Sequence, residues 1–283
     1  MELWFSERHT PNVKLSIKVD KQLLSVQSPF QRIDIFESQE FGRFLTLDGY
    51  MMLTEKDEFI YHEMITHVPM AVHPAPRDIL VIGAGDGGVL RELTRYDGVG
   101  HIDLVEIDRQ VVEACKQYLP QTACRFDDPR VSLHFEDGLK YVRRMENRYD
   151  IIIVDSTDPF GPGEGLFTME FYGNCFKALR EDGILVNQHE SPFYEQDAQA
   201  MKRAHKRIVQ SFAISRVYQA HIPTYPSGHW LFGFASKQYH PILDLNAMKW
   251  KTLGLRTKYY NTNLHKGAFY LPTYVEEMLT DVE

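Results

Sequence analysis

Apolar and polar residues alternate along most of the first 54 residues. The alternation runs through Val13–Val26, Gln31–Phe36 and Phe44–Leu53, and a period of two is typical of strands with one buried face. Turn residues separate these runs at Asp20-Lys21, Ser28-Pro29 and Asp48-Gly49. We therefore predict a small antiparallel β domain over residues 1–54. It is too small to bury much surface alone, so it should pack on the larger domain or on a partner subunit.

From residue 55 onward, helices and strands alternate. A helix is expected within 55–76, with Thr54 as a cap-like residue and Pro74 and Pro76 at its end. Further strands are expected at Asp78–Ile82, His101–Val105, Val131–Phe135, Asp150–Val154 and Ile184–Gln188, and further helices at Val89–Tyr96, Gln110–Tyr118, Gly138–Met145, Met169–Leu179 and Gln196–Ser211. This succession predicts a doubly wound, Rossmann-like α/β sheet as one domain over 55–283. Two last strands, Ser215–His221 and Trp230–Ser236, could add an antiparallel hairpin at one edge.

A glycine-rich turn follows the first strand of this domain. Residues 83–88 read GAGDGG and fit the GxGxxG pattern of nicotinamide, flavin and S-adenosylmethionine-type enzymes. Asp86 lies inside the turn, where a carboxylate would repel the pyrophosphate of a dinucleotide but attract an ammonium or sulfonium group. The turn therefore favours a cationic adenosyl ligand, unless Asp86 only caps the next helix and points away.

Acidic residues follow the other strands of the predicted sheet. Glu106 lies about twenty residues past the turn, where an acid accepts hydrogen bonds from ribose hydroxyls. Asp137 could meet an adenine amino group, with the Gly138 N–H beside it, or could simply cap a helix, as we expect of Asp108. Because ligands of open α/β sheets bind at the carboxyl ends of the strands, the following acids should meet in one crevice: Asp86, Glu106, Asp137, Asp155 and Asp158. Together they predict a site for cationic ligands.

Composition narrows the classes of function. The formal net charge of −8 argues against binding to nucleic acid, whose phosphates need a basic surface. The sequence lacks an apolar stretch of about eighteen residues and lacks a secretory leader at its start, so we expect no membrane association. The three cysteines form no CxxC pair, and a cytoplasmic location fits them. His62, Glu63 and His67 resemble a zinc HExxH helix, but the histidine spacing of five turns the second histidine away.

Several longer motifs resemble those of the spermidine synthase family. They are FQRIDIF, LTLDGYMMLTEKDEFIYHEMITHVP, VIGAGDGG, VEID, DSTDPFGPGEGLFT and PTYPSGHW, and they extend over nearly the whole chain. The resemblance implies an N-terminal β domain, a methyltransferase-like Rossmann domain and a homodimer or homotetramer. It also implies the transfer of an aminopropyl group from decarboxylated S-adenosylmethionine to putrescine, giving spermidine and methylthioadenosine in polyamine biosynthesis. The resemblance implies no metal or redox cofactor.

The resemblance also implies roles for single residues. The donor, decarboxylated S-adenosylmethionine, would be held by Gln31, Asp86, Glu106, Asp137, Gly138, Pro162 and Leu166. The amine would be bound by Tyr61, His62, Asp155, Asp158, Gln188 and Tyr225, with Asp155 as proton acceptor. Trp4 matches an aromatic at the far end of the amine channel in some members. His189 departs from the Gln-Ser-Glu-Ser-Pro of many relatives, and we expect it at the pocket edge or, rather, on a surface loop.

Other functions stay open on the sequence alone. The acceptor could be agmatine, cadaverine or spermidine, since these amines differ from putrescine only in length and end group. An S-adenosylmethionine-dependent methyltransferase is a weaker alternative, because Asp86 and the pair Asp155 and Asp158 disfavour the carboxylate of its donor. A non-catalytic polyamine-binding relative and a nicotinamide dehydrogenase are weaker still.

Overall fold

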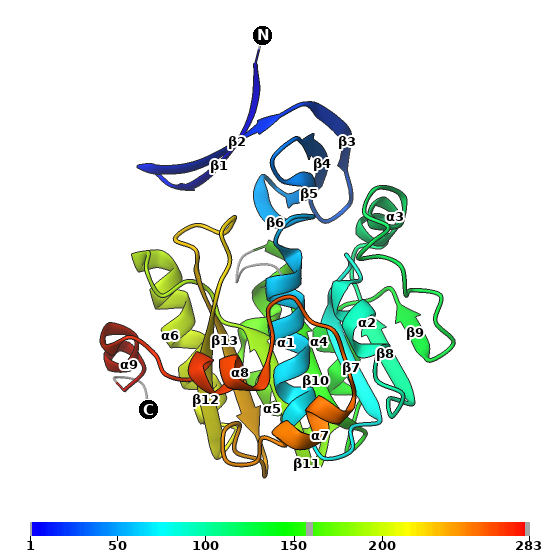
Figure 1. Ribbon diagram of the computed structural model, residues 1–283, viewed down its shortest axis with the longest axis vertical. Helices are drawn as coiled ribbons and strands as arrows, with labels where there is room; N and C mark the ends of the chain where they lie inside the picture. The colour runs from blue at the N-terminus through cyan, green and yellow to red at the C-terminus, as the bar shows by residue number, and fades with distance from the viewer. Residues whose placement is uncertain (1, 157–160, 281–283) are drawn as a thin grey trace.

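The structure, a computed structural model, describes residues 2–156 and 161–280. The N-terminal region forms two antiparallel sheets. β1 (Leu3–Thr10) pairs with β2 (Val13–Val19), and a four-stranded sheet follows with β3 (Lys21–Gln27), β4 (Arg32–Ser38), β5 (Gly42–Leu47) and β6 (Tyr50–Thr54) in sequential order. Figure 1 shows the β1–β2 hairpin projecting at the top left, over the side of the molecule that holds α6. The predicted antiparallel region is confirmed.

β1 had not been predicted, and its burial pattern explains why. Leu3 and Trp4 are half-exposed, whereas Glu7 is the one fully buried residue of the strand. A strand that buries an acid and exposes two of its three apolar residues gives no clear signal of alternation.

The helix α1 (Glu58–Val72) leads from β6 down to the large sheet. Its N-cap is Asp57 rather than Thr54, which corrects the expected start of the helix. The Thr54 hydroxyl donates to Asp57 Oδ1 at 2.7 Å, and Asp57 Oδ2 accepts from the Thr224 N–H at 3.0 Å. Fourteen residues of this helix are buried, so it is a central element and not a surface helix.

The large sheet has seven strands in the order β12-β13-β11-β10-β7-β8-β9. Its parallel part consists of β7 (Asp78–Gly83), β8 (His101–Val105), β9 (Val131–His134), β10 (Tyr149–Asp155) and β11 (Leu179–Gln188). β12 (Ile214–His221) and β13 (His229–Ser236) form an antiparallel hairpin that pairs with β11. The predicted doubly wound sheet and its edge hairpin are therefore confirmed.

Helices cover both faces of the sheet. Alternate strand residues such as Ile79, Val81 and Ile151 share a core with α1, α2 (Gly88–Leu93) and α3 (Arg109–Tyr118). The intervening residues, such as Leu80 and Ile152, pack with α4 (Gly138–Arg143), α5 (Met169–Ala178) and α6 (Glu195–Val209). A 3₁₀ helix spans Gly161–Phe167. None of the helices in the described ranges has the length and apolar character needed to cross a membrane.

The chain after the last strand forms three short helices that had not been predicted. They are α7 (Ala247–Thr252), α8 (Thr262–Ala268) and α9 (Thr273–Thr280). The segment between α7 and α8 is held against α1, because Glu63 accepts the N–H groups of Lys258, Tyr259 and Tyr260, each at 2.8 Å. This part of the chain therefore supports the central helix from outside.

Candidate active site

A pocket lies at the carboxyl ends of the parallel strands, beneath β5 and β6. It is lined by eleven of the residues expected in the site: Gln31, Tyr61, His62, Asp86, Glu106, Asp137, Gly138, Asp155, Leu166, Gln188 and Tyr225. Asp158 lies outside the described residues, as does the side chain of Pro162. The expected convergence of acids therefore holds for four of the five, since Asp86, Glu106, Asp137 and Asp155 face the same space.

The glycine turn brings β7, β10 and α1 close together. Gly83 has φ +83°, and a Cβ there would lie 1.9 Å from the carbonyl oxygen of Asp155. The Ala84 N–H donates to that same oxygen at 2.9 Å. A Cβ on Gly88 would lie 2.2 Å from the His62 ring. Glycine is therefore needed at both positions because backbone and ring approach too closely for a side chain.

Asp86 is held by two donors on the glycine-turn side of the pocket. Its Oδ1 accepts the Gly88 N–H at 2.7 Å and lies 3.1 Å from His62 Nε2. Asp86 therefore bonds the start of α2 and also lines the pocket, so its side chain does not point away from the site. Burial by itself would raise the pKa of Asp86, but the His62 imidazolium lowers it below its ordinary value.

His62 lies between two carboxylates. Its Nδ1 is 2.6 Å from Glu58 Oε2, and Arg91 donates to both oxygens of Glu58 at 2.8 and 2.9 Å. Burial opposes a charge on His62, but Asp86 and Glu58 raise its pKa to about 10. His62 is therefore a buried cation at neutral pH, and its charge stabilises the anionic form of Asp86.

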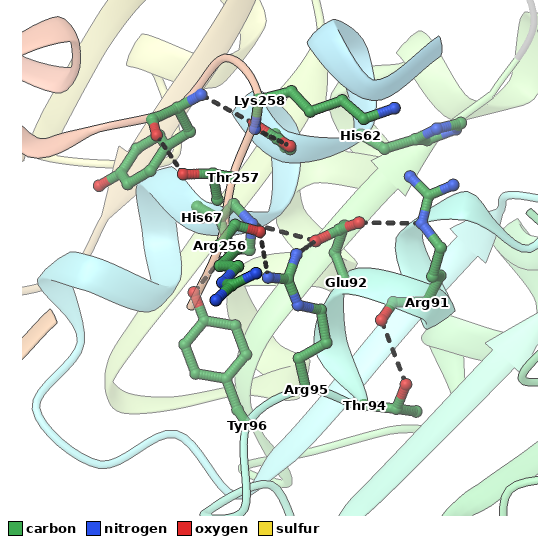
Figure 2. Close-up of polar contacts among 12 residues, drawn as sticks. His62, His67, Arg91, Glu92, Thr94, Arg95, Tyr96, Arg256, Thr257 and Lys258 are labelled. Carbon is green, nitrogen blue, oxygen red and sulfur yellow. Dashed lines mark hydrogen bonds and ion pairs between the residues drawn. The ribbon is translucent and has the colours of Figure 1, made fainter. Parts of the chain in front are cut away.

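Sequence reasoning had missed Glu58 and Arg91. Glu58 lies four residues before His62 in a predicted helix, and this spacing places two side chains on the same face; the signal was therefore present. Arg91 carried no such signal. While its two terminal nitrogens bond Glu58, Arg91 also donates through Nε to Glu92 of the same helix at 2.9 Å, and Glu92 contacts His67 as well (Figure 2).

Asp155 lies in a different environment at the end of β10. The Tyr61 hydroxyl donates to its Oδ1 at 2.7 Å. Its Oδ2 is buried and has no hydrogen-bond partner among the residues that the structure describes. Burial, with a further contribution from the charge of Asp86, raises the pKa of Asp155 to about 7. This carboxylate can gain or lose a proton near neutral pH.

Over β8 and β9 the pocket presents groups suited to a nucleoside. Glu106 Oε1 accepts the Asp108 N–H at 2.8 Å, and burial raises the pKa of Glu106 to about 7. Asp108 caps α3, as expected, and its Oδ2 accepts from Gln31 Nε2 at 3.2 Å. Asp137 caps α4 through the Leu139 N–H at 2.9 Å while it also lines the pocket. The N-terminal region therefore contributes Gln31 to this side.

Over β11 and β13 the walls of the pocket are amide and aromatic. Gln188 Nε2 donates to Glu190 Oε1 at 2.7 Å. The Tyr225 hydroxyl donates to the Met52 carbonyl at 2.6 Å, and its ring lies 4.7 Å from the ring of Trp230 and 6.2 Å from that of Tyr61, between centroids. Aromatic faces beside carboxylates are favourable surroundings for an alkylammonium group.

Two expectations about single residues are wrong. Trp4 is half-exposed on β1 and lies outside this pocket, because the alternation of the strand directs Glu7 and His9 inward instead. His189 is fully buried, neither on a loop surface nor in the pocket lining. Its ring packs at right angles on His205 of α6, with centroids 5.6 Å apart, since β11 continues to pair at this point through the His189 N–H and the Leu231 carbonyl.

The zinc-like triplet of α1 is separated as expected. His67 Nδ1 lies 2.7 Å from the Tyr96 hydroxyl, away from His62, and Glu63 is engaged by the C-terminal segment. His62, Asp86 and Asp155 do place one ligand-type atom each within 4.8 Å of one another. Both nitrogens of His62 already face carboxylates, so His62 is suited to holding an anion rather than a metal ion.

The fold is Rossmann-like, and its crevice is lined by acids, an arrangement suited to a cationic ligand. Two family models match the chain: "Spermidine synthase tetramerisation domain" over residues 3–55 and "Spermine/spermidine synthase domain" over residues 58–247. The chain belongs to the spermine/spermidine synthase family, which confirms the resemblance seen in its motifs.

Relatives match the whole chain. The polyamine aminopropyltransferases of Clostridium perfringens strain 13 and Alkaliphilus oremlandii are 71% and 70% identical over 283 residues, covering 100% of this chain and of each relative. A spermidine synthase solved in complex with the transition-state analogue AdoDATO superposes with a TM-score of 0.96 at 47% identity, covering 98% of this chain and 95% of that one. The Thermotoga maritima enzyme gives 0.94 at 46%, covering 98% and 94%.

Proposed function

We propose that the protein is a spermidine synthase that transfers the aminopropyl group of decarboxylated S-adenosylmethionine to putrescine. The observation that carries the proposal is Asp155, a partly exposed carboxylate with a raised pKa, of which one oxygen is bound by Tyr61 and the other is buried without a hydrogen-bond partner among the described residues. Support comes from the relative solved with the transition-state analogue AdoDATO. The products are spermidine and methylthioadenosine, which places the reaction in polyamine biosynthesis.

The proposed reaction is a direct displacement. The sulfonium of the donor makes the adjacent carbon of its aminopropyl group electrophilic. The acceptor amine loses a proton to Asp155 and attacks this carbon, so that a C–N bond forms while the C–S bond breaks and its electrons stay on the sulfur of methylthioadenosine. Tyr61 orients the carboxylate of Asp155. Much of the rate should come from holding two cations in line at short distance, which they avoid in water.

The donor would lie over β7, β8 and β9. We propose that Glu106 accepts hydrogen bonds from the ribose hydroxyls, that Asp137 and the Gly138 N–H meet the adenine, and that Asp86 attracts the charged end of the donor. Gln31, Pro162 and Leu166 would complete this site. On the other side of Asp155, the amine would be bound by Tyr61, His62, Asp158, Gln188 and Tyr225.

We propose two domains, 1–54 and 55–283, and a homodimer or homotetramer; the match to a tetramerisation domain supports an oligomer. We propose a cytoplasmic location and no partner of nucleic acid or membrane.

The reaction should need no metal or redox cofactor, because His62 and Asp86 pair with each other. Full activity after dialysis against EDTA is the expected outcome. Restoration of activity only by a divalent ion would contradict it.

An assay with two donors tests the proposed function. The protein is incubated with labelled S-adenosylmethionine or its decarboxylated form, each with putrescine, agmatine, cadaverine or spermidine. We expect consumption of the decarboxylated donor only, fastest with putrescine, and release of methylthioadenosine. Consumption of only the carboxylated donor would establish a methyltransferase instead. If another amine reacts faster than putrescine, the proposed reaction stands and that amine is the preferred acceptor.

A further inference from the structure

The N-terminal strand reaches into the pocket with two charged residues. Glu7 and His9 follow each other at a spacing of two on β1, and both line the pocket. Glu7 is only 3% exposed, and its Oε2 accepts the Met51 N–H at 2.8 Å. Its other oxygen lies 3.6 Å from His9 Nδ1. The strand therefore directs an acid, Glu7, toward the pocket and not toward solvent.

His9 bridges from β1 to the catalytic part of the chain. Its Nε2 lies 2.8 Å from Asp197 Oδ2, in the first turn of α6, and its ring packs on Tyr194 with centroids 4.5 Å apart. Burial disfavours the charged ring, but the hydrogen bonds to Asp197 and Glu7 raise the pKa of His9 to about 9. At neutral pH the pocket is therefore bordered here by an imidazolium.

The order of the strands locates this imidazolium relative to the reaction. Asp155 ends the central strand β10, and the groups suited to a nucleoside lie on the β7, β8 and β9 side. On the opposite side come β11 and then α6, which follows β11 in the chain and carries Asp197. His9 therefore lies beyond the end of β11, at the end of the pocket that remains for the amine. Figure 1 shows the β1–β2 hairpin over this same side.

We propose that the pair of His9 and Asp197 closes the amine end of the pocket and limits the acceptor to short diamines. This inference rests on the proposed function. The second ammonium of a short diamine would meet the carboxylate of Glu7. A triamine such as spermidine is longer, and its additional part would meet the His9 ring, which Asp197, Glu7 and Tyr194 hold in place. The pair thereby selects against acceptors of greater length.

Kinetics with two acceptors test the pair. kcat/KM is measured for putrescine and for spermidine in the unaltered protein and in the variants His9→Ala, Asp197→Asn and Arg8→Ala. Arg8 is the matched control, because it is a cation on the same strand whose side chain is exposed and lies outside the pocket lining. We expect the kcat/KM for spermidine, divided by the kcat/KM for putrescine, to rise about tenfold or more in His9→Ala. It should rise by a smaller factor in Asp197→Asn, and the ratio in Arg8→Ala should equal that of the unaltered protein.

The ratio separates selection from mere support of the fold. If the contact between His9 and Asp197 only supported the fold, its loss would lower kcat/KM for both amines by the same factor. An unchanged ratio of the two kcat/KM values in both His9→Ala and Asp197→Asn would therefore overturn the proposal. The same variants are also tested for binding of each amine by thermal shift. If no donor is consumed with any amine, the proposed function fails. The relative binding of putrescine and spermidine then still tests the role of His9 and Asp197, because a pocket closed at this end must also bind the two amines with different affinity.

Discussion

Asp86 and Asp155 face the same pocket, yet their surroundings are opposite. Asp86 accepts the Gly88 N–H and lies beside the His62 imidazolium, which is itself fixed by Glu58. Asp155 accepts one hydrogen bond, from Tyr61, and keeps one buried oxygen without a hydrogen-bond partner among the described residues. The pKa of Asp86 is lowered despite burial, whereas burial raises that of Asp155 to about 7.

This difference assigns two tasks to one residue type. A carboxylate surrounded by donors remains an anion and can attract a cation throughout the reaction. A carboxylate deprived of donors can accept a proton at neutral pH. The donors around Asp86 and Asp155, rather than the type of side chain, therefore make the first a lasting anion and the second a group that can take up a proton.

The largest effect should follow from Asp155→Asn. An amide cannot accept the proton, so kcat should fall about 10²–10⁴-fold while binding of methylthioadenosine is largely kept. Steady-state rates with putrescine and calorimetric titration with methylthioadenosine measure the two quantities. Asp86→Asn is the contrasting variant, in which binding of the decarboxylated donor should suffer first. A fully active Asp155→Asn protein would remove Asp155 from its task.

A smaller effect is expected from Glu106→Ala, which addresses donor binding alone. Hydrogen bonds to a charged group contribute about 1.5–3 kcal/mol, so the Kd of methylthioadenosine should rise roughly 10–100-fold. The KM of putrescine should change little, because Glu106 lies on the β8 side of Asp155. Glu113→Ala, an exposed acid on α3, is the control. Equal changes for nucleoside and amine would contradict the division of the pocket into two sides.

The acids of the site could be predicted from sequence because the rule behind them is topological. Apolar runs such as Asp78–Ile82 and Asp150–Val154 identify buried parallel strands, and parallel strands end at one edge. The meeting of Asp86, Glu106, Asp137 and Asp155 follows from that, whereas the order of the strands does not. Which of these acids would be charged does not follow, because that depends on donors from other elements.

Those donors come from contacts that no local pattern reveals. His62 meets Asp86 only because α1 packs on α2 at Gly88, where the ring occupies the place of a side chain. His9 reaches Asp197 across 188 residues of sequence, on a strand whose burial pattern is inverted. His189 follows a strand end but stays buried because β13 continues to pair there. In each case tertiary packing, and not secondary-structure propensity or hydrophobic periodicity, determines where the side chain lies.

A further effect, about tenfold, is expected from Glu58→Gln, which removes one of the two anions that keep His62 charged. We expect kcat/KM to fall about tenfold, within the range seen when partners that orient a site residue are removed, because a weaker imidazolium stabilises Asp86 less. Glu92→Gln is the matched control, since Glu92 also pairs with Arg91 but does not touch His62. Both variants should lower thermal stability. Equal losses of activity in the two would assign Glu58 a purely structural role.

The smallest effect is a pH dependence of stability. The pKa of Asp155 is about 7 in the folded protein against 3.8 ordinarily, so between about pH 4 and 7 the folded chain binds this proton and the unfolded chain does not. Stability from this group therefore falls as pH rises through that window and stays low above it. Because His62 and Glu106 also titrate, the useful quantity is a difference between variants.

Thermal unfolding of the unaltered protein and of Asp155→Asn from pH 5 to pH 8 isolates that difference. Asparagine has no charge to bury, so the Tm of the variant should gain on that of the unaltered protein by a few degrees as pH rises. Adding a cationic donor should narrow the gap, because its charge compensates the Asp155 anion. Parallel curves would mean that Asp155 is ionised at pH 5 already. It would then be an anion of the same kind as Asp86, and the contrast between the two carboxylates would disappear.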